Sequence, residues 1–200
     1  LTQPDDPTRT QVLAALCRQG YRADGAMEAT IAEQLETEAK LAAWLAAAQA
    51  DLSGEPDTAL VCAALKEQLN RVRLRILCWL SYLHDPAAIM QIGRILRIEG
   101  AAGGVVRRLG GSEQERADAL EALEVLLPGR QRASVIPILD GRPAAALRTA
   151  LADAYPQEDM SPTARLEAII DGFAPWFAPW TKATAIDAVA RLPAPELVET

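Results

Sequence analysis

Residues 57–84 read DTALVCAALKEQLNRVRLRILCWLSYLH and carry the most regular apolar pattern of the chain. Apolar residues recur there at steps of three and four, the spacing of one face of an α-helix. They are Leu60, Ala64, Leu65, Leu69, Val72, Ile76, Leu80 and Leu83. A second apolar side appears in the C-terminal half, at Leu74, Leu77 and Trp79. We therefore predict a helix over 57–84 that neighbours cover on two faces, as in the middle of a helical stack.

Start and stop signals divide the rest of the chain into further helices. Asp6-Pro7 and Gly20 bracket a short first helix, and Asp24 begins a longer second one. Ser112 and Glu115 have the spacing of a capping box, which predicts a helix that continues to Pro128. The remaining predicted helices span 86–98, 130–139, 143–154, 162–172 and 179–191. No segment alternates with period two for long enough to predict a strand.

The composition agrees with an all-α class. Half of the 200 residues are hydrophobic, many of them Ala, and only 4% are aromatic. Such a chain favours closely packed helices over sheets. Short helix, turn, short helix is the recurring unit, and it predicts a HEAT-like α-solenoid or superhelical stack of antiparallel helix pairs in one domain, 1–200. The Gly-rich stretch 99–111 is expected to be a loop or insertion.

Three segments carry a family resemblance. They are RLRILCWLSYLHDPAAI (73–89), ERADALEALEVLLP (115–128) and IPILD (136–140). Together with Ala178-Pro-Trp180 and the helix after it, they resemble the HEAT-like region of bacterial transporter fusions that also contain a cyclic-nucleotide-binding domain. These transporters are of the major-facilitator or ATP/ADP-translocase-like kind. The resemblance covers about residues 60–195, and the Gly-rich stretch 99–111 departs from it.

The resemblance implies a non-catalytic, cytoplasmic accessory module, and therefore an interaction or regulatory scaffold. Its partners would be another protein or other domains of the same chain, and no catalytic residue, cofactor site or metal site is carried over. The chain starts with Leu1 instead of Met, which we interpret as a fragment of a longer protein.

The charge is unevenly distributed and points to a first candidate surface. The net charge is -7, but residues 66–148 carry +4 between flanks of -6 and -5. An Arg-rich middle could face acidic partners or an anionic membrane surface. The candidate residues are Arg73, Arg94, Arg97, Arg107 and Arg108. A HEAT-like nucleic-acid binder is the alternative, which the overall acidity and the few aromatics disfavour.

Phe173-Ala-Pro-Trp176-Phe177-Ala-Pro-Trp180 is the second candidate surface. Exposed Phe173, Trp176 and Phe177 would form an aromatic anchor of the kind found at interface hot spots. Alternatively, they fill the seam between helices near the C-terminal end.

An enzyme on a helical scaffold is the weakest alternative. His84 is the only histidine and precedes Asp85-Pro86, where a helix C-terminal cap is the favoured role. The three cysteines, Cys17, Cys62 and Cys78, show no CxxC spacing and fit buried free thiols. The glycines of 99–111 match neither of the phosphate-binding motifs GxxxxGK(S/T) and GxGxxG.

Arg71, Arg73 and Arg75 alternate along the longest predicted helix. This spacing distributes them around the helix instead of aligning them on one face. At least one is therefore expected to pair with a carboxylate inside the stack.

Overall fold

The computed structural model describes residues 6–98, 100, 111–172 and 178–191. These residues form nine α-helices and two short 3₁₀ turns, with no strand among them. The helices are α1 (Asp6–Arg18), α2 (Glu28–Asp51), α3 (Ala59–Leu83), α4 (Pro86–Ile95), α5 (Glu113–Leu126), α6 (Gly129–Leu139), α7 (Ala144–Leu151), α8 (Pro162–Asp171) and α9 (Pro179–Arg191). The all-α prediction is confirmed. Within the described ranges, no helix has both the length and the apolarity that crossing a membrane requires.

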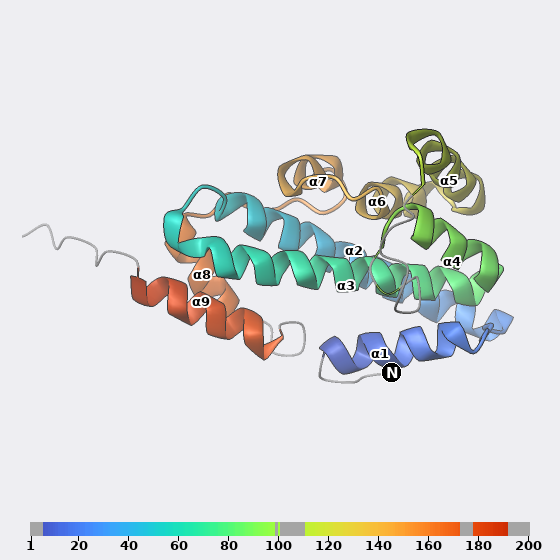
Figure 1. Ribbon diagram of the computed structural model, residues 1–200, viewed down its shortest axis with the longest axis horizontal. Coiled ribbons are helices and arrows are strands. Elements are labelled where there is room, and N and C mark those ends of the chain that lie inside the picture. The colour runs from blue at the N-terminus through green and yellow to red at the C-terminus, as the bar shows by residue number, and fades with distance from the viewer. Residues whose placement is uncertain (1–5, 99, 101–110, 173–177, 192–200) are drawn as a thin grey trace, which may run out of the picture.

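The two longest helices, α2 and α3, lie side by side through the middle of the molecule (Figure 1). They run antiparallel because the chain reverses after α2, where Gly54 has a left-handed φ of 99°. The buried side of α2 is rich in small residues, which allow the two backbones to approach closely. They are Ala39, Ala42, Ala43, Ala46, Ala47 and Ala48.

The other helices cover the two sides of this central pair (Figure 1). Helices α1, α4 and α9 pack on α3, whereas α6, α7 and α8 pack on α2. Helix α5 lies outside, against α4 and α6. In a solenoid each repeat contacts only its sequence neighbours, but α7, α8 and α9 reach back to α2 and α3. The predicted solenoid stacking is therefore not confirmed.

Most predicted helix boundaries agree with the structure within a few residues. The helix expected over 57–84 is α3, preceded by the 3₁₀ turn Pro56–Thr58 and capped by His84. The capping box is present: Glu115 N–H donates to Ser112 Oγ, and Ser112 N–H donates to Glu115 Oε2. The helix expected over 86–98 ends earlier, at Ile95.

The early end of α4 is a Schellman motif with an arginine in the glycine position. Ile98 N–H donates to Gly93 O at 2.9 Å, and Arg97 N–H donates to Arg94 O at 3.1 Å. Arg97 consequently has a φ of 59°, a left-handed conformation that side chains with a Cβ disfavour. Burial of Ile98 after the turn offsets this strain.

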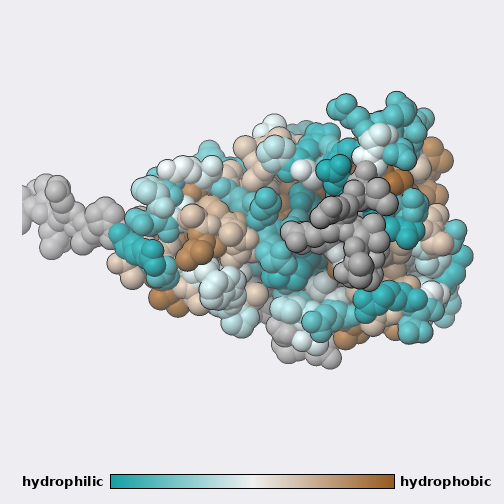
Figure 2. All heavy atoms as spheres, viewed as in Figure 1, coloured by the Kyte–Doolittle hydropathy of each residue, from teal (hydrophilic) through white to brown (hydrophobic). Residues whose placement is uncertain are grey.

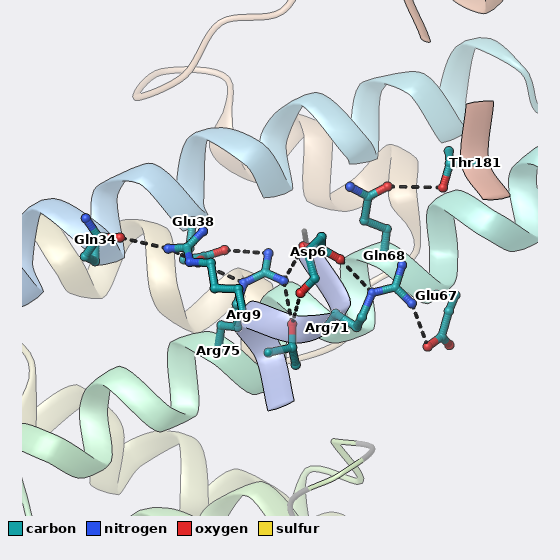
Figure 3. A network of polar contacts seen from close by, with 10 residues as sticks. Asp6, Arg9, Gln34, Glu38, Glu67, Gln68, Arg71, Arg75 and Thr181 are labelled. Atoms are coloured by element: carbon teal, nitrogen blue, oxygen red, sulfur yellow. Dashed lines mark hydrogen bonds and ion pairs between the residues drawn. The ribbon is translucent and has the colours of Figure 1, made fainter. Parts of the chain in front are cut away.

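A charged network is buried where α1, α2 and α3 meet (Figure 3). The Arg75 side chain is fully buried, and its Nε and Nη2 donate to Glu38 at 2.9 and 2.8 Å. Its Nη1 donates to Asp6 and to Thr10 Oγ1. Arg71 Nε donates to the other Asp6 oxygen at 2.7 Å. The expectation that one of these arginines pairs with a carboxylate inside the stack is confirmed.

A second cluster holds α7 and α8 on the end of α2. Both oxygens of the buried Asp51 carboxylate are occupied: Oδ1 accepts from Arg148 Nη1 at 2.9 Å, and Oδ2 accepts from Arg165 Nη2 at 2.6 Å. The Arg165 guanidinium also lies over the Trp44 ring, 5.1 Å from its centroid. One carboxylate thus positions two helices.

The buried network makes Glu38 far more important for stability than a surface glutamate on the same helix. Glu38→Gln keeps the side-chain volume but removes one of the two carboxylates that balance the buried Arg75 charge, so we expect a loss of about 3 kcal/mol. Glu36→Gln removes a partly exposed pair with Lys40 and should cost less than about 1 kcal/mol. Urea unfolding of both variants measures the difference. Equal losses would contradict this account of the network.

Arg97→Gly should stabilise the protein by about 1 kcal/mol, because glycine adopts the left-handed conformation without strain. Arg94→Gly, in the last turn of α4, is the matched control and should destabilise by about 1 kcal/mol. The free energy of unfolding in urea distinguishes the two variants. If Arg97→Gly is less stable than the unaltered protein, the Arg97 side chain stabilises the fold by more than its left-handed backbone conformation costs.

Candidate interaction surface

Helix α9 is fixed to the rest of the molecule by its inner side. Thr181, Thr184, Ala185 and Ala188 are buried. Thr181 Oγ1 lies 3.3 Å from Gln68 Oε1 on α3. Lys182 Nζ donates to the Ile170 carbonyl on α8 at 3.1 Å. These contacts determine which side of α9 faces solvent.

The outer side of α9 exposes several apolar side chains. Trp180 is 64% exposed, Ile186 55% and Val189 36%. Ala183 and Ala190 are also exposed and lie on the same side. These five residues are called the α9 outer face below. Figure 2 shows hydrophobic and hydrophilic residues next to one another over α9, at the left of the view.

Leu60 adds exposed apolar surface at the same end of the molecule. It is 52% exposed and follows the 3₁₀ turn that α9 contacts. A contiguous apolar area on a protein surface is typical of an interaction site. Charged residues interrupt the α9 outer face: Asp187, four residues after Ala183, lies on the same side of the helix and pairs with Arg191 at 2.9 Å.

Of the aromatic residues in the strip predicted from sequence, the structure describes only Trp180. Phe173, Trp176 and Phe177 lie outside the described residues. Trp180 is described and its side chain is exposed.

The predicted arginines are not brought together by the described part of the chain. Arg73 is half-buried, its Nε donates to the Ile138 carbonyl at 2.8 Å, and burial lowers its pKa. Arg94 and Arg97 are exposed at the end of α4. Arg107 and Arg108 lie outside the described residues. Of the predicted surface arginines that the structure describes, Arg94 and Arg97 present their charge to solvent, whereas Arg73 binds a carbonyl within the fold.

His84 ends α3 with extended backbone dihedrals, and its N–H donates to the Leu80 carbonyl at 2.9 Å. This is the capping position expected from the sequence. Among the described residues, no group of three or more His, Cys, Asp or Glu side chains is arranged to hold a metal ion.

Comparison of the chain with protein families, with curated proteins and with solved structures found no match.

The exposure of Ile186 and Val189 was not predicted from sequence. A signal for it exists, because α9 has apolar residues on both sides: Ala185 and Ala188 face inward, while Ile186 and Val189 face outward. Large apolar residues on two sides of a helix indicate that both sides are normally covered. The described residues pack on only one side of α9.

Since the chain has a single histidine, its titration can be followed cleanly. Burial, and then the nearby Arg22 charge, lower the pKa of His84 below its ordinary value of 6.5. The folded state therefore binds this proton less tightly than the unfolded state, and His84 should reduce stability as the pH falls through 6.5 toward its folded pKa. An NMR titration of the imidazole Cε1–H measures this pKa directly.

Arg22→Gln should move the His84 pKa upward, toward 6.5, because it removes the nearby positive charge. Arg18→Gln is the control and should leave the titration unchanged. A His84 pKa above 6.5 in the unaltered protein would be inconsistent with the burial described.

Proposed function

We propose that the protein is a non-catalytic interaction or regulatory scaffold that binds an apolar helix of a partner protein on the α9 outer face. The single observation that supports this most directly is the exposure of Trp180 and Ile186 on a helix whose other side is packed in the fold. Trp is among the residues most enriched at interface hot spots.

The energetics favour a partner on this surface. Burying one large aliphatic or aromatic side chain contributes about 1.5–3 kcal/mol. The surface offers four such side chains: Trp180, Ile186, Val189 and the neighbouring Leu60. The binding free energy is what remains of their burial after the cost of association is subtracted. Ala183 and Ala190 leave room for the backbone of a second helix to approach. A helix that presents an apolar stripe is the complementary shape.

We also propose what kind of larger protein contains this helical module. Sequence neighbours α2 and α3, α6 and α7, and α8 and α9 pack as pairs, which supports a HEAT-like origin of the helical units. Together with the resemblance over 60–195, this supports a cytoplasmic accessory module of a membrane-transporter fusion. In such a chain, the α9 outer face is available to another domain of the same chain or to a separate protein.

Ile186→Asp should disrupt partner binding without affecting folding, because the side chain is exposed. With a photoreactive phenylalanine derivative in place of Ala183, we expect one cross-linked adduct of defined mass in the producing cells. Ile186→Asp should reduce that adduct by about tenfold, which corresponds to 1.4 kcal/mol of lost affinity. Circular dichroism verifies the helical content of each variant.

Val125→Asp is the matched control, because Val125 is an 80% exposed aliphatic residue on α5, away from α9. It should leave the adduct at position 183 unchanged. If both aspartate variants reduce the adduct equally, or if Ile186→Asp has no effect, the α9 outer face is not the binding surface.

A further inference from the structure

Two cysteines from different helices meet in the core between α1 and α3. Cys17 lies in the last turn of α1, and Cys78 lies in α3. Both are buried, at 4% and 0% exposure. Ser81 Oγ lies 3.0 Å from Cys17 Sγ and 2.8 Å from the Cys78 carbonyl oxygen. The Ser81 contact brings the Cys17 thiol against α3 on the side that also carries Cys78, one helical turn earlier, and the two thiols form a side-chain hydrogen bond.

The two thiols are electrostatically unequal. A hydrogen bond from the Cys78 thiol, assisted by the Ser81 hydroxyl, lowers the pKa of Cys17 to about 6, although burial acts in the opposite direction. The hydrogen bond to Cys17, together with burial, raises the pKa of Cys78 well above its ordinary value. Cys17 is thus the better nucleophile of the pair, and Cys78 holds the proton.

We propose that Cys17 and Cys78 form a reversible intramolecular disulfide by exchange with a small disulfide such as glutathione disulfide. The Cys17 thiolate attacks one sulfur of glutathione disulfide, whose S–S bond breaks and releases one glutathione thiolate. Cys78 then loses its proton and attacks the Cys17 sulfur of the mixed disulfide, which releases the second glutathione. The protein loses two electrons and two protons, and one glutathione disulfide becomes two glutathiones.

Access to the pair depends on α1. This helix packs on α3, so a small disulfide can reach the buried thiols only when the C-terminal end of α1 moves away from α3. Cys17 is one residue from the end of α1, before a turn at Gly20 with a φ of 69°. A helix end opens and adjusts more readily than a helix centre. Opening of the C-terminal end of α1 would therefore admit glutathione disulfide, and adjustment of the same end would bring the Cys17 and Cys78 sulfurs to bonding distance.

The disulfide would connect α1 covalently to α3 and enclose α2 in the resulting loop. A cross-link of this kind restricts the unfolded chain, and longer loops are restricted more. The reduced protein would allow α1 to leave α3, whereas the oxidised protein would retain it. The pair would act as a redox-dependent latch on the first helix.

Cys62 provides an internal control. It is half-buried near the start of α3, and burial raises its pKa. Its Sγ lies 3.9 Å from the Thr58 hydroxyl and 3.9 Å from the Leu52 carbonyl, without a second cysteine in these contacts. Cys62→Ser therefore removes the third thiol without altering the proposed pair.

The test is oxidation of the folded Cys62→Ser protein in buffers of increasing glutathione disulfide to glutathione ratio. We expect the intact mass to decrease by two hydrogens and trypsin to release one cross-linked peptide that joins 10–18 to 76–94. Thioredoxin or dithiothreitol should restore both thiols. The oxidised form should unfold at a higher urea concentration than the reduced form.

Cys17→Ala and Cys78→Ala, each in the Cys62→Ser background, should give no cross-link and no oxidation-dependent shift in urea. Their circular dichroism shows whether they fold, and the Cys62→Ser protein alone is sufficient to decide the question. If its thiols stay reduced at every ratio, or if glutathione adducts accumulate without the cross-linked peptide, the proposed disulfide is refuted.

Discussion

The buried guanidinium of Arg75 is the constraint on which the central helices depend. Arginine stays charged in proteins, so a fully buried arginine requires carboxylates at fixed positions. Glu38 on α2 supplies one and Asp6 on α1 supplies the other, at the two ends of the same planar group. A shift of either helix along α3 would separate a charge from its partner. Apolar packing alone tolerates such shifts, whereas this network selects one register.

Local patterns predicted the helices, and long-range contacts escaped prediction. The steps of three and four over 57–84 specify α3, and the spacing of Ser112 and Glu115 specifies the start of α5. The sequence also indicated that an arginine among 71, 73 and 75 would be paired. It could not indicate which one, because that choice depends on where α1 and α2 lie. The layered packing around α2 and α3 likewise depends on pairs such as Asp51 and Arg165, which no local pattern contains.

The candidate surface was predictable in the same partial way. Helical periodicity tells which residues share a side of α9, but it does not tell which side the other helices cover. Trp180 belonged to the predicted aromatic strip because Phe-Ala-Pro-Trp occurs twice in 173–180, whereas Ile186 and Val189 resemble ordinary core residues. Arg73 shows the opposite case: its charge suggested a surface role, and the fold uses it to bind the Ile138 carbonyl. The Schellman motif at the end of α4 could not be predicted, because it has Arg97 at the position where glycine usually marks such a helix end.

Asp51 has a consequence for the order in which the chain folds. Its two partners follow it by 97 and 114 positions, whereas Glu38 meets Arg75 after only 37. Contacts between distant positions form late, because closing a long loop costs more entropy. During synthesis from the N-terminus, the charges shared by α1, α2 and α3 are complete once α3 has emerged. Until the ribosome has delivered α7 and α8, the Asp51 carboxylate lacks both of its arginine partners and stays hydrated, so a charge placed early in the chain is paired only by its last third.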